Sequence, residues 1–120
     1  MYDITCLNQC MEDLKPKSNG TESISWKFIG EDCLMLIYTT IVHIASDTSM
    51  RLQVARESER SISMIDDFSK AVKKQYKEKS GSSIKLKEAS TDDDIEIIST
   101  TFHSPRKSGY YRRKVMFKIG

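Results

Sequence analysis

Three cysteines and two histidines are the residues best suited to metal or nucleophilic chemistry. Cys6 and Cys10 are four positions apart, so on a helix their thiols would share one face. Together with His43 or His103 they would give a ligand set that zinc accepts. Structural zinc sites usually take a close cysteine pair from a turn, and the apolar neighbours of Cys10 favour a packing role. We therefore expect reduced cysteines, no metal and no cofactor.

An acidic run offers oxygen ligands of the kind that calcium and magnesium prefer: Asp92, Asp93, Asp94 and Glu96. The spacing of an EF-hand is absent, and no lysine follows Glu96 as a magnesium nuclease would need. A solvated turn at Asp92–Asp94 is the better interpretation. The chain also lacks a Gly-x-Ser-x-Gly elbow and a glycine-rich phosphate loop. These absences predict a protein that is not an enzyme.

The clearest binding feature is the basic C-terminal segment. From 103 to 120 the chain carries no acid, and aromatic residues are interleaved with its cations. Basic side chains contact phosphates, and aromatic rings on a sheet stack on bases. A protein surface of opposite charge would be recognised by the same cations. The expected binding residues are Arg106, Lys107, Tyr110, Arg112, Arg113, Lys114 and Lys118.

An acidic segment precedes this basic one in the chain. Residues 88–96 hold five acids and no base, and they lead into the strand that should lie next to the basic strand. The two blocks could offset each other across a hairpin or remain a solvated face. Internal pairing or solvation, a protein partner and a nucleic acid therefore all stay open for the basic strand.

Hydrophobic periodicity predicts the elements that position these residues. Amphipathic helices are expected at 2–15 and 61–79, and strands at 24–28, 34–44, 84–88, 95–102 and 110–119. The apolar stretch 34–44 is typical of a central strand covered on both faces. Ser49–Glu57 fits either a strand or the start of the long helix, and we favour the strand.

Two faces matter most for the core and the site. On the second helix, Phe68 should lie mid-face in the core, in a stripe made of Ile62, Ile65, Phe68, Val72 and Tyr76. On the last strand, alternation separates an inward apolar face from an outward basic one. The inward residues are Val115, Phe117 and Ile119, and the outward residues are Arg112, Lys114 and Lys118, with Met116 among them.

These elements favour one α+β domain over 1–120. We expect an antiparallel, meander-rich sheet of five or six strands with two amphipathic helices on one face. The similar outlines of the two halves suggest a pseudo-duplicated α-β-β-β unit. Two helices leave one sheet face underprotected, and a monomer rarely tolerates a large apolar patch. A homo-oligomer or larger assembly is therefore expected.

Composition narrows the function classes. The 19 basic and 17 acidic residues leave a charge of +2, which excludes a histone-like polycation. The cysteines are odd in number and expected to be free thiols, which favours a reducing compartment such as the cytoplasm. We expect neither an export signal nor a membrane span. We predict a small non-enzymatic binding or assembly subunit that uses its sheet surface and basic C-terminal strand. Its composition also suits a phage or mobile-element accessory or virion component. The alternative is a nucleic-acid-binding module using the basic, aromatic-interleaved C-terminal hairpin.

Overall fold

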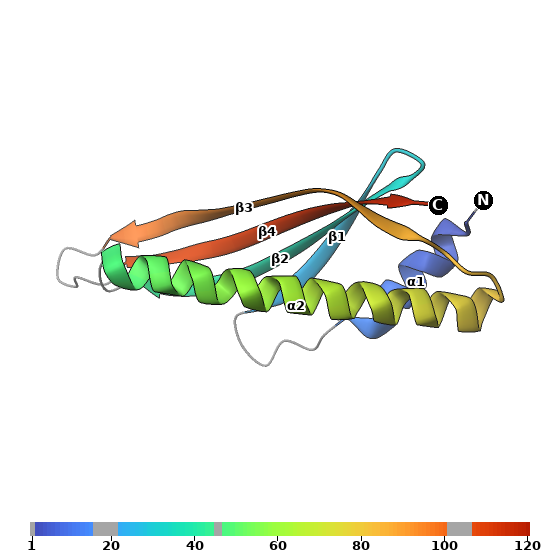
Figure 1. The fold of residues 1–120 in the computed structure, drawn as a ribbon, viewed down its shortest axis with the longest axis horizontal. Helices are drawn as coiled ribbons and strands as arrows, with labels where there is room; N and C mark the ends of the chain where they lie inside the picture. Colours follow the sequence, from blue (N-terminus) through green and yellow to red (C-terminus); the bar gives the residue numbers. More distant parts are fainter. Residues whose placement is uncertain (1, 16–21, 45–46, 101–106) are drawn as a thin grey trace.

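The described part of the chain folds into two helices and a four-stranded antiparallel sheet, an α+β arrangement (Figure 1). A computed structural model describes residues 2–15, 22–44, 47–100 and 107–120. The sheet has the strand order β1-β2-β4-β3, so the two inner strands come from different hairpins. The elements in chain order are α1 (Ile4–Leu14), β1 (Ser23–Ile29), β2 (Cys33–Ile44), α2 (Asp47–Ser80), β3 (Leu86–Thr100) and β4 (Lys107–Ile119).

The expectation of five or six strands was wrong, because one long strand replaces two short ones. β3 runs for 15 residues straight through Asp92–Asp94, where we expected a turn. Aspartate is a poor strand former on its own. In this sheet, however, the three aspartates stand opposite Lys114, Arg113 and Arg112 of β4. Opposite charges paired across strands stabilise a sheet, and this offsets the poor local propensity.

The strand favoured for Ser49–Glu57 was also wrong, because this segment is the first part of the 34-residue helix α2. Leu52 supported the strand pattern, yet it is 65% exposed. The side of α2 that faces the sheet instead continues through Glu57 and Ser61, which are 5% and 0% exposed. Two buried polar residues interrupt the apolar stripe, so the helical period was hidden in the sequence.

The core lies between the helices and one face of the sheet. Phe68 is 5% exposed and its ring stacks on Trp26 at 6.2 Å between centroids, which confirms its predicted place in the core. Ile62, predicted for the same stripe, is 51% exposed and lies outside the core. The short helix α1 packs mainly on α2, and the main-chain N–H of Asp3 donates to the Tyr76 hydroxyl at 2.9 Å.

β2 is a central strand, as predicted, but it is covered on one face only. Leu34, Leu36 and Tyr38 are at most 1% exposed beneath the helices. The alternate residues point to the opposite face, and no described element packs on them, because both helices share one side of the sheet. Each helix is followed by two strands, one strand fewer than the α-β-β-β unit that we expected.

Candidate functional site

The sheet face opposite the helices, here called the open face, gathers the outward residues of all four strands. Alternation along the strands and their register assign these residues. They are Ser25, Lys27 and Ile29 of β1; Cys33, Met35, Ile37, Thr39 and Ile41 of β2; Tyr110, Arg112, Lys114, Met116 and Lys118 of β4; and Lys87, Ser90, Asp92, Asp94 and Glu96 of β3.

An apolar row runs along the middle of the open face. Met35, Ile37 and Ile41 of β2 are only half-buried, although they occupy a central strand. Met116 of β4 stands directly opposite Met35 in the register and widens the row. Beside these two methionines, Lys114 borders a shallow hollow of about 180 Å³. Flexible methionines adapt to partners of different shape, which suits a binding surface.

The basic strand β4 divides its side chains between two faces, as alternation predicted. Val115, Phe117 and Ile119 are 3%, 6% and 7% exposed beneath the helices, which confirms the inward set. Four of the predicted binding residues lie together on the open face: Tyr110, Arg112, Lys114 and Lys118.

Of the three other predicted binding residues, Arg113 is the one whose side chain the structure describes, and it does not join this group. Arg113 lies on the helix side, with 14% of its side chain exposed and with Asp93 3.7 Å from its Nη1. That nitrogen also donates to the Ser58 Oγ at 3.2 Å, so the guanidinium is held within the fold. Lys107 begins β4, but its side chain lies outside what the structure describes, as does Arg106 altogether.

Acidic residues of β3 lie directly beside the open-face cations. Asp92 stands opposite Lys114, and Asp94 stands opposite Arg112. This register favours one of the alternatives that the sequence left open, in which the acidic and basic segments offset each other's charge within the chain. The same alternation sends Asp93 to the helix side, where it accepts a 2.9 Å hydrogen bond from the Tyr111 hydroxyl. The acidic run is thus split between two faces, with Asp93 on the helix side and Asp92, Asp94 and Glu96 spaced along the open face.

The described residues that were considered for zinc do not come together in one place. Cys6 and Cys10 lie on α1, where burial raises the pKa of the Cys10 thiol, and Cys33 lies on the open face. His43 has its Nδ1 3.4 Å from the Ser108 Oγ at the far end of β2. His103 falls outside the described residues. Within the ranges that the structure describes, no three metal-ligating side chains gather.

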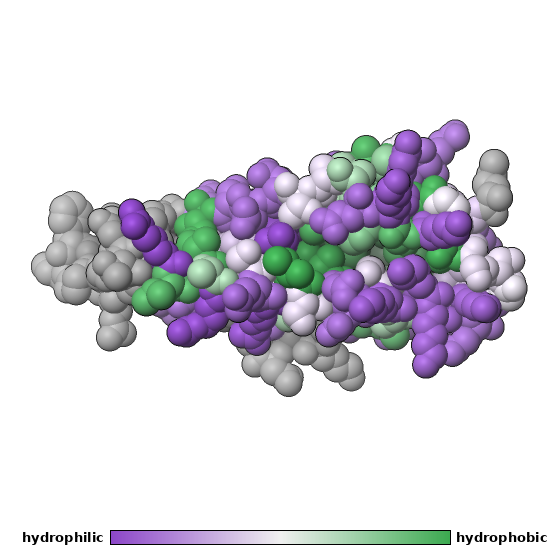
Figure 2. All heavy atoms as spheres, in the orientation of Figure 1, coloured by the Kyte–Doolittle hydropathy of each residue, from purple (hydrophilic) through white to green (hydrophobic). Residues whose placement is uncertain are grey.

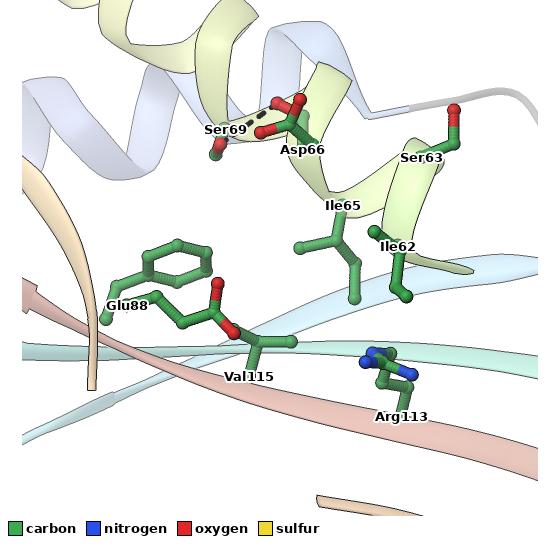
Figure 3. A pocket seen from close by; sticks show the side chains of 9 residues that line it. Ile62, Ser63, Ile65, Asp66, Ser69, Glu88, Arg113 and Val115 are labelled. Carbon is green, nitrogen blue, oxygen red and sulfur yellow. Dashed lines mark hydrogen bonds between the residues drawn. The ribbon is translucent and has the colours of Figure 1, made fainter. Parts of the chain in front are cut away.

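A groove between α2 and the strands β3 and β4 is a feature that the sequence did not predict. Figure 2 shows hydrophobic side chains between α2 and β3, and Figure 3 shows Ile65 above Val115 at this place. Glu88 and Arg113 extend from the sheet toward the helix, where Asp66 lies at the rim (Figure 3). The groove encloses about 180 Å³. Small-molecule sites usually enclose about 300–1,000 Å³, so the groove is a weak candidate.

A buried polar pair lies under the first half of α2. The Tyr38 hydroxyl donates to Glu57 Oε2 at 3.3 Å, and Gln53 Nε2 donates to Glu57 Oε1 at 3.2 Å. Burial is the main cause that raises the pKa of Tyr38, and the Glu57 carboxylate adds to it. Both effects disfavour a charged phenolate. The pair therefore holds α2 onto β2 in a form that depends on a protonated tyrosine.

Replacing Tyr38 with phenylalanine should change the stability of the chain in alkaline solution. In the unfolded chain this tyrosine ionises near its ordinary pKa of about 10, whereas the folded chain keeps the proton. Above that pH the unfolded state binds fewer protons, so stability falls as pH rises. Urea unfolding at several pH values from 8 to 11 gives the free energy of unfolding at each pH. Above the ordinary pKa of tyrosine, this free energy should fall more steeply with pH in the wild type than in Tyr38→Phe, by up to about 1.4 kcal/mol per pH unit. If the free energy of unfolding depends on pH equally in both proteins, Tyr38 is not held buried and protonated in the folded chain.

The fold and the open face together define the class of this chain: an α+β unit whose helices share one side of a four-stranded sheet and whose other side is mixed apolar and charged. Comparisons with protein-family models, with curated proteins and with solved structures found no match. Neither helix, within the residues described, combines the length and apolar character needed to cross a membrane.

Proposed function

We propose that this chain is a small, non-enzymatic binding or assembly subunit that engages a protein through the open face of its sheet. The observation that carries the proposal is the half-buried apolar row of β2, on which no described element packs. Large apolar patches on monomers usually mark interaction sites. Cations of β4 border the row and would supply orientation and partner selection.

The acids of β3 support a protein rather than a nucleic acid as the partner. A phosphate backbone that approached Arg112 and Lys114 would also meet Asp94 and Asp92. Nucleic-acid affinity comes largely from uncompensated cations, and these two are flanked by carboxylates. An apolar row next to alternating charge is instead the usual composition of a protein interface.

The repeated order of elements supports a finer proposal about the architecture. One helix and two strands occur twice along the chain, and the inner strands β2 and β4 of the two hairpins pair at the centre of the sheet. We infer a pseudo-duplicated α-β-β unit, shorter by one strand than the repeat that the sequence suggested.

A matched pair of isoleucine variants tests the proposed function. Ile37 lies on the open face and Ile62 lies exposed on α2, so Ile37→Asp and Ile62→Asp introduce the same charge at two different surfaces. Each variant and the wild type serve as bait in the cell extract of the source, with thermal unfolding as the check of folding. The wild type and Ile62→Asp should retain the same stoichiometric partner, which is the chain itself or another protein. Ile37→Asp should lose it.

Two results would contradict the proposed function. One is that a folded Ile37→Asp variant retains its partner as well as the wild type does. The other is that Ile62→Asp loses the partner while Ile37→Asp keeps it, which would move the interaction to α2 and its groove.

A further inference from the structure

The pairing of opposite charges between β3 and β4 breaks down at one end of the open face. Arg112, Arg113 and Lys114 of β4 each stand opposite an aspartate of β3, whereas Lys118 stands opposite Lys87. Both of these lysines are exposed, and neither forms an ion pair with a described residue. Like charges directly opposite each other destabilise a sheet. This row therefore weakens the fold instead of supporting it.

Two further lysines extend this pair into a basic patch. Lys27 of β1 lies on the open face one row along the sheet from Lys118. Lys85 precedes β3, and its main-chain N–H donates to the Gly120 carbonyl at 3.1 Å, so alternation gives its side chain the same face as Lys87. Both added lysines are exposed, and neither forms an ion pair with a described residue. We call these four residues the lysine patch: Lys27, Lys85, Lys87 and Lys118.

The acids nearest to the lysine patch in the sequence do not neutralise it. Glu88 stands opposite the inward Phe117, and its side chain extends toward α2 (Figure 3). Glu31 and Asp32 lie in the turn between β1 and β2, where the Tyr2 hydroxyl donates to the Glu31 carbonyl at 2.6 Å. None of these three acids forms an ion pair with the lysine patch. The described part of the open face therefore carries four positive charges at this end without an ion-pair partner.

Protection of the sheet edges explains only part of the lysine patch. Lys27 and Lys87 lie on the edge strands β1 and β3, where lysine side chains discourage pairing with the edge of another sheet. Lys118 lies on the inner strand β4, between β2 and β3, so it protects no edge. An exposed lysine on an inner strand, opposite a second lysine, indicates instead a surface that receives negative charge from outside the chain.

We propose that the open face binds a different protein, which presents a cluster of aspartates and glutamates to the lysine patch. This inference rests on the proposed function, because it uses the same surface. Opposite potentials on two protein surfaces speed their encounter and select the partner. The bound carboxylates also relieve the repulsion between Lys87 and Lys118, so the row that weakens the free chain strengthens the complex.

The lysine patch is close enough to the apolar row for one partner to cover both. Met35 and Met116 follow Lys27 in one row across the sheet. The row of Lys118 is two residues away, a step of about 7 Å along the strands. Across the sheet, Lys27 and Lys87 are separated by three strand spacings, or about 14 Å. A compact acidic surface next to an apolar one therefore fits the patch and the apolar row together.

Other occupants of the open face offer a poorer match to the lysine patch. The open face of a second copy would present Asp92 and Asp94, but these already stand opposite Lys114 and Arg112 of their own chain. A nucleic acid carries negative charge along its whole backbone, so a strand that ran from the patch along the sheet would meet the same two aspartates. A different protein can confine its acids to the patch.

Lys87→Glu and Lys118→Glu separate a binding role from a structural one, because the two expected effects have opposite signs. Each variant replaces the like-charge pair with an opposite-charge pair, so its melting temperature should rise by about 1–4 °C. The protein that the wild type retains from the cell extract is identified and purified, and its affinity for each variant should fall about tenfold in isothermal titration calorimetry. Lys74→Glu on α2 makes the same change of charge at an exposed lysine without an ion pair to a described residue, and should leave the affinity unchanged.

A water-soluble carbodiimide tests the chemistry of the contact in the same complex. The reagent joins a lysine amine to a carboxylate in contact with it, forming an amide with loss of water. Mass spectrometry should find Lys87 and Lys118 joined to aspartates or glutamates of the bound protein, and Lys74 not joined. Absence of these links from the lysine patch would overturn the acidic partner. Loss of binding after treatment with a nuclease or a phosphatase would place phosphate groups on the patch and overturn it as well.

Failure of this inference and failure of the proposed function give different results. If Ile37→Asp loses the retained protein while Lys87→Glu and Lys118→Glu bind it as the wild type does, the acidic partner is wrong and the proposed function stands. The same conclusion follows if the retained protein is a second copy of the chain. A wild type that retains no protein overturns both.

Discussion

Phe68→Ala should lower the free energy of unfolding by about 3–5 kcal/mol, the usual cost of removing a buried phenylalanine side chain. Phe68 is 5% exposed and lies at the centre of the only layer in which the described helices meet the sheet. Its ring stacks on Trp26, so the substitution removes an aromatic contact as well as apolar burial. A domain of this size is typically stable by about 5–15 kcal/mol, so the variant would be close to unfolding.

Urea unfolding of Phe68→Ala beside Ile62→Ala gives the matched comparison. Ile62 lies on the same helix but is 51% exposed, so its truncation should cost less than about 1 kcal/mol. A loss below about 1 kcal/mol for Phe68→Ala would contradict the packing of this face of α2 against the sheet.

Arg56→Pro should cost about 3 kcal/mol or more, because position 56 lies inside a helix. Proline there removes the hydrogen bond to the carbonyl of Leu52, and its ring clashes with that carbonyl. Arg56 is exposed, so the loss of its side chain contributes little by itself. The sequence pattern had favoured a strand for this segment, and an edge strand would tolerate the same substitution much better.

Arg56→Ala is the control for that prediction, since alanine keeps the helix and removes the same charge. Far-ultraviolet circular dichroism and urea unfolding should show near-normal helix content and stability for Arg56→Ala, and losses in both for Arg56→Pro. Equal stability of the two variants would contradict a helix at 47–57.

The sequence predicted the helices and most strands because their apolar residues repeat cleanly. It failed where the stabilising partner is distant in the chain. Asp92–Asp94 continues a strand because β4 supplies three opposite cations, and nothing local to the aspartates announces this. The first part of α2 was missed for a related reason, since Glu57 is buried against Tyr38 and cannot be recognised as a core residue by its type.

The candidate site was predicted in part. Alternation correctly separated Lys114 and Lys118 from the inward residues of β4. The same alternation assigns Arg113 to the inward face of Val115, but its charge led us to count it among the binding residues. The structure has Asp93 and Ser58 beside it on the helix side. The pattern of β2 by itself favoured cover on both faces, since an apolar strand has the same sequence whether a helix or a partner protein covers its second face. The small number of expected helices was the feature that predicted an underprotected sheet face.

Oxidation of the methionines by dilute peroxide, followed by mass spectrometry of the chain with and without its bound protein partner, tests the open face most directly. Met35 and Met116 stand opposite each other on this face, whereas Met64 lies half-buried on α2 and serves as the internal reference. The account predicts that Met35 and Met116 oxidise readily in the free chain and become protected when the partner binds, while the rate at Met64 stays constant. Binding that leaves the rates at Met35 and Met116 unchanged relative to Met64 would contradict it.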